Sequence, residues 1–225
     1  MNAFESNRAK EVNLEYRPSV LHFGGNNAIG DAGAVALAAA LRMAKGHNHH
    51  VLEELDLSSC NIGDAGVEAL ALAVASNPDC LRRLDLSNNK ISDAGATSLG
   101  KALVDANRVS DVIFENIILD NNVGISDGGA AALAEAWAYG AVKSISLRSC
   151  SVQAQGASAF GRALVSLANR NNQCHHFFLD LSGNHFGTLK KAKKGGSCRP
   201  SSRYSQYKHK IHWEATKGCG KTIYL

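Results

Sequence analysis

The sequence has no long apolar run and no sorting signal at its start. A membrane-spanning helix needs roughly 18 consecutive apolar residues, and the longest apolar stretches here are alanine-rich and broken by Gly, Glu or Arg. The first twenty residues, MNAFESNRAKEVNLEYRPSV, contain no apolar core of the kind that a secretory signal requires. We therefore predict a soluble protein with no membrane partner, located in the cytoplasm, with the nucleus as the alternative.

The short paired spacings of cysteine and histidine that mark structural zinc sites are also missing. The six cysteines are scattered, at Cys60, Cys80, Cys150, Cys174, Cys198 and Cys219. In a cytoplasmic protein we expect reduced thiols. The nearest approaches to a ligand set are a loop cluster, His47, His49 and His50, and a looser group, Cys198, His209, His212 and Cys219. Neither has the required spacing, so we expect no metal ion and no cofactor.

No pattern of catalytic residues stands out from the rest of the sequence. Gly220-Lys221-Thr222 resembles the end of a phosphate-binding loop. However, Ala215 stands where that loop needs a glycine, and only three residues remain to form the helix that must follow. We therefore predict that the protein is not an enzyme and has no small-molecule substrate.

Charge is divided unevenly along the chain. Residues 1–189 contain 14 Lys and Arg against 19 Asp and Glu, a net charge of −5. Residues 190–225 contain 10 against one, a net charge of +9, and the two parts give the overall +4. The basic character therefore belongs to the tail alone.

One sequence pattern recurs along the chain. Two copies are complete, LEELDLSSCNIGDAG at residues 52–66 and LRRLDLSNNKISDAG at residues 81–95. Both follow L-x-x-L-x-L-x-x-N/C-x-L, the signature of leucine-rich repeats. Four less regular copies share the frame, so that the third apolar position falls at residues 23, 57, 86, 119, 147 and 181. We predict about six repeats over residues 18–189, an N-terminal flank or partial cap at 1–17, and a tail at 190–225.

Each repeat joins a short alternating segment, which predicts a strand, to a longer segment with helical spacing. Val67–Asn77 and Ala96–Asn107 are the clearest helical segments. We expect Asp64, Asp93 and Asp127 at the helix starts, where a carboxylate accepts free backbone N–H groups. One unit cannot bury its own apolar side chains, so the units must stack. The predicted fold is an α/β leucine-rich-repeat solenoid, a partial horseshoe with parallel strands on the concave face and helices on the convex face.

Polar residues follow the predicted strands at one position of the repeat. Amides stand there in four repeats, at Asn26, Asn89, Asn122 and Asn184, and thiols in two, at Cys60 and Cys150. We expect the amides to bond backbone groups that the bend leaves unpaired. We expect the two thiols to be buried and structural rather than catalytic.

The 28–29-residue spacing, the LDLS core and the GDAG and SDAG helix starts together resemble the ribonuclease-inhibitor-like subfamily of leucine-rich repeats. That subfamily includes ribonuclease inhibitor, the Ran GTPase-activating protein and the repeat arms of NOD-like receptors. The resemblance implies a horseshoe that binds a protein partner, so an interaction module or scaffold is the expected function. It also permits two alternatives, a Ran-type GTPase-activating protein and a fragment of a NOD-like-receptor-type sensor. The former usually has an acidic C-terminal segment, whereas this tail is basic.

Residues that alternate with the leucines point away from the core. We expect them to bind the partner on the concave face, and the candidates are Glu54, Asp56, Ser58, Arg83, Asp85, Ser87, Asn116, Asp120, Arg148 and Asp180. The repeat frame puts a carboxylate at the middle position in four repeats, which predicts an acidic stripe made of Asp56, Asp85, Asp120 and Asp180. Such a row favours a basic protein partner. The alternative is a row of solvated strand residues.

The tail combines basic and aromatic residues without a repeat pattern or a helical apolar stripe. Its basic residues between Lys190 and Lys210 are interleaved with Tyr204 and Tyr207, and Trp213 follows, types that attract phosphates and stack on bases. Nucleic-acid binding is one interpretation. A disordered solubilising tail and an intramolecular partner for the acidic stripe are the others. A charge run alone carries little specificity, so we expect a disordered tail.

Overall fold

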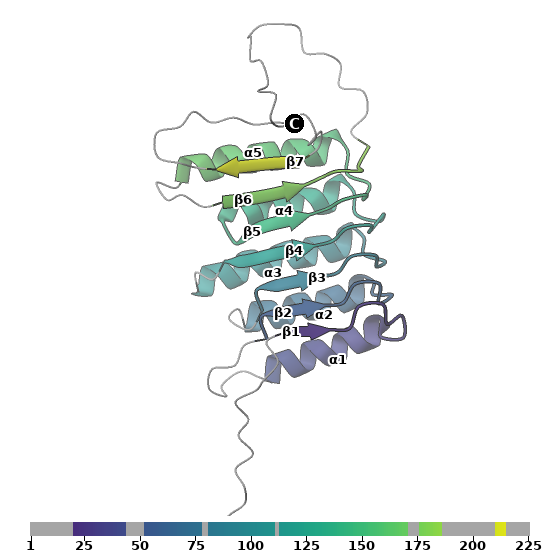
Figure 1. Cartoon of the computed structure of the whole chain (residues 1–225). Helices are drawn as coiled ribbons and strands as arrows, with labels where there is room; N and C mark the ends of the chain where they lie inside the picture. Colours follow the sequence, from purple (N-terminus) through teal and green to yellow (C-terminus); the bar gives the residue numbers. More distant parts are fainter. Residues whose placement is uncertain are drawn as a thin grey trace, which may run out of the picture.

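The computed structural model of the chain describes residues 20–43, 52–77, 81–110, 113–170, 176–185 and 210–214. Strands and helices alternate along it as β1 (Val20–His22), α1 (Gly30–Met43), β2 (Glu54–Asp56), α2 (Asp64–Ser76), β3 (Arg83–Asp85), α3 (Asp93–Ser110), β4 (Phe114–Ile118), α4 (Asp127–Tyr139), β5 (Val142–Ser146), α5 (Ala154–Arg170), β6 (His176–Asp180) and β7 (Lys210–Glu214). Strands β1 to β6 pair in parallel and in chain order. The sheet forms one layer and helices α1 to α5 form the other (Figure 1). The fold is therefore an α/β solenoid, as the sequence predicts.

The leucine positions of the repeat build the core between the two layers. The strand register places one apolar residue per strand side by side, namely Leu55, Leu84, Ile117, Ile145 and Leu179. None of these side chains is more than 1% exposed. The next apolar positions, from Leu57 to Leu181, are buried in the same way. The second to sixth repeats thus contribute the same buried positions to one continuous core, against which the half-buried Leu21 and Phe23 of the first repeat pack.

Glycines allow neighbouring helices to pack closely. A Cβ atom on Gly95 would lie 2.6 Å from Oδ1 of Asp64 in the preceding repeat, and one on Gly100 would lie 2.8 Å from the backbone oxygen of Ala132 in the following repeat. Both distances are shorter than van der Waals contact. Glycine at these two positions is therefore required by the packing between repeats.

Aspartates at the helix starts cap the next helix and not their own. Asp64 is the first residue of α2, as predicted, but its Oδ1 accepts the N–H groups of Ser92 at 2.8 Å and Gly95 at 3.0 Å, at the start of α3. The N-cap residue of α2, Gly63, makes no side-chain capping bond. Equivalent bonds to the following helix start come from Asp31, Asp93 and Asp127. The expected cap within one helix is thus corrected to a cap between repeats, because stacking brings each helix start beside the first turn of the previous helix.

Amide side chains after the strands bond backbone groups of the turns, as predicted, and three of them also link neighbouring repeats. Oδ1 of Asn89 accepts the N–H groups of Cys60 at 3.1 Å and Ile62 at 2.9 Å. Its Nδ2 donates to the backbone oxygens of Leu57 at 2.8 Å and Leu86 at 2.9 Å. Asn122 and Asn184 make bonds of the same kind. Asn26, in the first repeat, is exposed, and its Oδ1 accepts the N–H of Ala28.

Strand β7 comes from the tail and pairs with β6 in the antiparallel direction, with Lys210 opposite Asp180 (Figure 1). At its five residues the structure differs from the expectation of a disordered tail. Without β7, strand β6 would be a sheet edge with unpaired backbone groups, and such an edge accepts another strand. The flank at 1–17 and the tail residues 190–209 and 215–225 lie outside the described residues, where those expectations stay predictions.

Candidate binding face

The sheet surface that points away from the helices, predicted to be concave, is called the strand face below. Strand pairing places its residues in two rows that run across the repeats. The first row consists of Val20, Glu54, Arg83, Asn116, Ser144 and Phe178. The second row consists of His22, Asp56, Asp85, Ile118, Ser146 and Asp180. Six of the ten residues predicted from alternation stand in these rows, namely Glu54, Asp56, Arg83, Asp85, Asn116 and Asp180. Ser58, Ser87, Asp120 and Arg148 follow the strands.

Asp120 does not belong to the second row, which corrects the predicted stripe. Ile118 is the register partner of Asp85, so Asp120 lies two residues further along the chain. The reason is that Asp85 comes directly before a buried leucine, Leu86, whereas Asp120 comes directly after the equivalent buried leucine, Leu119. Oδ1 of Asp120 accepts a hydrogen bond from the hydroxyl of Ser146 at 2.6 Å and another from the N–H of Arg148 at 2.9 Å.

Two of the predicted binding residues are buried. Asp180 is only 3% exposed and Ser87 only 6%, so neither offers a surface to a partner. The other eight predicted residues remain accessible. Arg83 and Arg148 are exposed, and the half-buried ones are Glu54, Asp56, Ser58, Asp85, Asn116 and Asp120. The accessible acidic part of the second row is therefore the pair Asp56 and Asp85.

Each aspartate of the LDLS core also has a structural role. Oδ1 of Asp56 accepts the N–H of Ser58 at 2.9 Å, and Oδ1 of Asp85 accepts the N–H of Ser87 at 2.8 Å. Burial on its own would raise the pKa of Asp56, but the bonds from Ser58 and the nearby His22 outweigh it and hold that pKa below its ordinary value. Asp56 is therefore a fixed anion rather than a freely rotating side chain.

The first row contains an arginine held between two glutamates. Nη2 of Arg83 lies 2.9 Å from Oε2 of Glu115, and Nη1 lies 3.6 Å from Oε2 of Glu54. The hydrogen bond and charge of Glu115 raise the pKa of Arg83 further. Alternation could not predict the contact with Glu115, because the N–H groups of both Glu115 and Asn116 bond to the backbone oxygen of Arg82. Two residues of β4 thus pair with one residue of the neighbouring strand, which interrupts the alternation of side chains at the start of β4.

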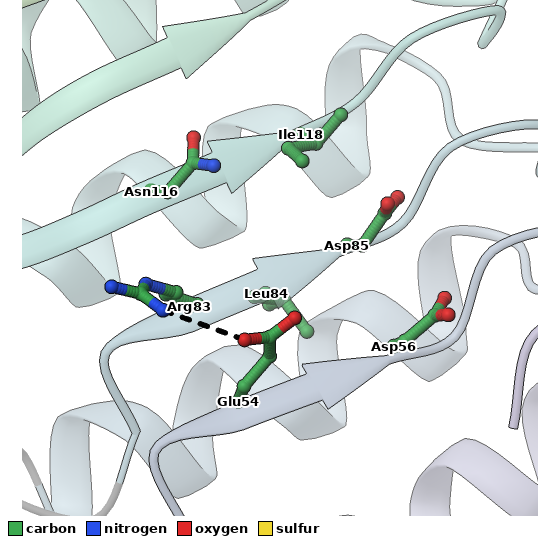
Figure 2. A pocket seen from close by; sticks show the side chains of 7 residues that line it. All are labelled: Glu54, Asp56, Arg83, Leu84, Asp85, Asn116 and Ile118. Carbon is green, nitrogen blue, oxygen red and sulfur yellow. Dashed lines mark ion pairs between the residues drawn. The ribbon is translucent and has the colours of Figure 1, made fainter. Parts of the chain in front are cut away.

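A shallow pocket of about 80 Å³ lies where the two rows cross β2, β3 and β4 (Figure 2). Its lining residues are Glu54, Asp56, Arg83, Leu84, Asp85, Asn116 and Ile118. Sites for small-molecule ligands usually measure about 300–1,000 Å³. The pocket therefore has room for the end of one side chain rather than for a whole small-molecule substrate.

The two described cysteines are structural. Sγ of Cys60 donates to the backbone oxygen of Phe23 at 3.2 Å, and Sγ of Cys150 donates to that of Leu119 at 3.4 Å. Burial raises the pKa of the Cys150 thiol to about 11 and also raises that of Cys60, which disfavours the reactive thiolate. Among the described residues, no three His, Cys, Asp or Glu side chains are grouped so as to hold a metal ion. The described helices also include none that could span a bilayer.

Comparison with known families supports the repeat assignment. The family model described as Leucine Rich repeat matches residues 19–38, 47–71 and 79–100, which contain strands β1, β2 and β3. No curated protein matches the chain. Leucine-rich repeats generally mediate protein–protein interaction. The chain thus contains leucine-rich repeats, and its described part folds as a leucine-rich-repeat solenoid.

Proposed function

We propose that the chain is a protein-interaction module that binds a basic partner on the strand face over β2, β3 and β4. The observation that carries this proposal is a local excess of negative charge. Around Arg83, which is the single cation lining the pocket, lie four carboxylates, those of Glu54, Asp56, Asp85 and Glu115. An acidic surface attracts and orients a basic partner.

The same charge argues against nucleic acid as the partner of this face, because a phosphate backbone is drawn to basic groups. The basic tail residues 190–209 lie outside the described residues, so nucleic-acid binding there stays a separate hypothesis. No described feature of the strand face favours a GTPase-activating or sensor role. The interaction module is therefore the function that the geometry supports best.

A reducing compartment, the cytoplasm or the nucleus, is part of this proposal. Cys60 and Cys150 lie in different repeats, and both are buried free thiols that donate hydrogen bonds. Such thiols persist where disulfides are not formed.

Affinity capture with the full-length chain as bait tests the proposal. The wild-type bait is compared with Asp56→Asn/Asp85→Asn, in which each amide oxygen still accepts the N–H of Ser58 or Ser87. The matched control is Glu68→Gln/Glu135→Gln, which removes two exposed carboxylates from helices α2 and α4. We expect a partner that the wild type and the control capture and the Asp variant loses. Equal capture by all three baits would place the binding site elsewhere.

A further inference from the structure

The two rows of the strand face differ in how their carboxylates are neutralised. In the first row, the chain supplies its own guanidinium, Arg83, between Glu54 and Glu115 on the strands to either side. In the second row, Asp56 and Asp85 are register partners on neighbouring strands, with no Lys or Arg bonded to either among the described residues. Arg83 lines the same pocket but pairs with Glu54 and Glu115. Nδ1 of His22 lies 3.5 Å from Oδ2 of Asp56. Over the residues that the structure describes, the Asp56 and Asp85 pair therefore has no bonded guanidinium or ammonium group, unlike Glu54 and Glu115.

The Asp56 and Asp85 carboxylates are already oriented for a partner. Their Oδ1 atoms are held by the N–H groups of Ser58 and Ser87, while within the described part of the chain Oδ2 of Asp85 accepts no hydrogen bond. The strands lie about 4.8 Å apart, and Figure 2 shows both side chains rising on the same side of the sheet. A group that binds here does not have to immobilise them first, which lowers the entropic cost of binding.

Part of the pocket wall beside these carboxylates is apolar. Ile118 is the next member of the second row after Asp85, and Leu84 also lines the pocket of about 80 Å³. Figure 2 shows Ile118 beside Asp85 on the neighbouring strand. A ligand that satisfies this lining needs a cationic end and an aliphatic stem, and both long basic side chains have this form.

Arginine fits this arrangement better than lysine. Its planar guanidinium presents several N–H donors at fixed angles, so it bonds two carboxylates at once, and it loses hydration more readily than an ammonium group. The contacts of Arg83 in the adjacent row show that this spacing of strands accommodates a guanidinium between carboxylates. We infer that the strand face seats one arginine side chain of the partner protein between Asp56 and Asp85, with its aliphatic stem against Ile118. The inference rests on the proposed function and specifies the chemistry of the partner.

NMR titration of the full-length ¹⁵N-labelled chain with N-acetyl-arginine amide tests this arginine-binding site between Asp56 and Asp85, called the seat below. The matched ligands are N-acetyl-citrulline amide, which has the same shape without the charge, and N-acetyl-lysine amide. We expect the arginine ligand to shift the amide signals of Asp56, Asp85 and Ile118 in a saturable way. The lysine ligand should bind more weakly, and the citrulline ligand should leave these signals in place. Equal shifts with citrulline, or none with arginine, would overturn the inference.

Variants locate the contact within the face. Asp85→Asn should weaken binding of the arginine ligand about two- to fivefold, within the range expected for losing one partner of an accessible ion pair. Glu53→Gln, an equal change of charge on the segment that leads into β2 but outside the pocket lining, should leave the affinity unchanged. An equal loss in both variants would mean diffuse attraction and would refute a seat. Unperturbed signals of the buried core in each variant establish that it is folded.

The outcome separates this inference from the proposed function. If the captured partner depends on Asp56 and Asp85 but the arginine ligand does not bind, the seat is wrong and the interaction module stands. If the arginine ligand binds with the expected selectivity while no partner is captured through the strand face, the seat stands and the proposed function fails.

Discussion

Asp64 and Gly95 belong to successive repeats, yet the Asp64 carboxylate accepts the backbone N–H of Gly95 at 3.0 Å. The same pairing joins Asp93 to Gly129 at 2.8 Å and Asp127 to Gly156 at 2.8 Å. The D-A-G or D-G-G at the starts of α2, α3 and α4 is therefore one half of a joint between repeats. Its aspartate caps the next helix and its glycine fits against the previous one.

Removing one of these joints should destabilise the array. In Asp93→Ala, the N–H groups of Ser126 and Gly129 lose a charged acceptor, at a cost of about 1.5–3 kcal/mol. The measurement is urea denaturation at neutral pH. As a control, Asp105→Ala removes an exposed carboxylate of the same helix, whose contact with Arg108 at 3.6 Å is worth under ~1 kcal/mol. Equal losses in the two variants would show that the joint adds nothing.

Acid should loosen the same joints. Burial would raise the pKa of Asp64 and Asp93, but bonds from Ser92 and Gly95, and from Ser126 and Gly129, outweigh it and lower both pKa values below 3.8. A carboxyl group with a lowered folded-state pKa contributes stability that is complete above its unfolded-state value. That stability is lost as pH falls below about 4 and through the lowered pKa.

The pH effect is measured as the difference in unfolding free energy between the wild type and Asp93→Asn. We expect the difference to be constant from neutral pH down to about pH 5 and to shrink below it, since only the wild type carries the titrating group. A difference that grows on acidification would contradict the assignment.

Two glycines at the same helix position give a matched pair for the packing between repeats. Gly100→Ala would place a Cβ atom 2.8 Å from the backbone oxygen of Ala132, so we expect a loss of about 1–3 kcal/mol from overpacking. Gly161 occupies the equivalent position of α5, where a Cβ atom would meet nothing within 4 Å. Gly161→Ala should therefore stabilise the protein by about 0.5–1 kcal/mol through helix propensity. The measurement is the melting temperature of both variants. Similar shifts of the same sign would show that α4 does not pack tightly on Gly100.

The fold could be predicted from the sequence because its information is local and repeated. Alternation around Leu55 and Leu84 defines the strands, and the spacing of apolar residues after Asp64 and Asp93 defines the helices. What the sequence could not supply is how one repeat lies on the next. The carboxylate of Asp64 is an N-cap by local rules, and only stacking turns it toward the next helix.

The binding face was predicted less fully for the same reason. Counting positions put Asp120 in the acidic row, but pairing depends on which side of the buried leucine a residue lies. The burial of Asp180 depends on tertiary packing at the last repeat, which no spacing encodes. The contact of Arg83 with Glu115 arises from doubled backbone pairing at Arg82. Such features follow from tertiary geometry and not from periodicity.

Because Asp56 and Asp85, but not Asp120, belong to the second row, their substitution should affect a partner bound to the strand face differently. Asp56→Asn/Asp85→Asn should weaken binding at least about tenfold, since two fixed carboxylates lose their charge at the centre of the contact. Asp120→Asn should change the affinity less than about twofold, because this carboxylate already accepts bonds from Ser146 and Arg148 and lies outside the pocket.

Salt provides the second readout of this prediction, measured by titration calorimetry over a series of ionic strengths. Exposed charges are screened over about 8–10 Å near physiological salt, so wild-type affinity should fall as salt rises. The double variant should show a flatter dependence, because fewer charges contribute, and Asp120→Asn should follow the wild type. Parallel salt curves for all three proteins would assign the charge attraction to another part of the chain, and the acidic row would then be a set of solvated strand residues.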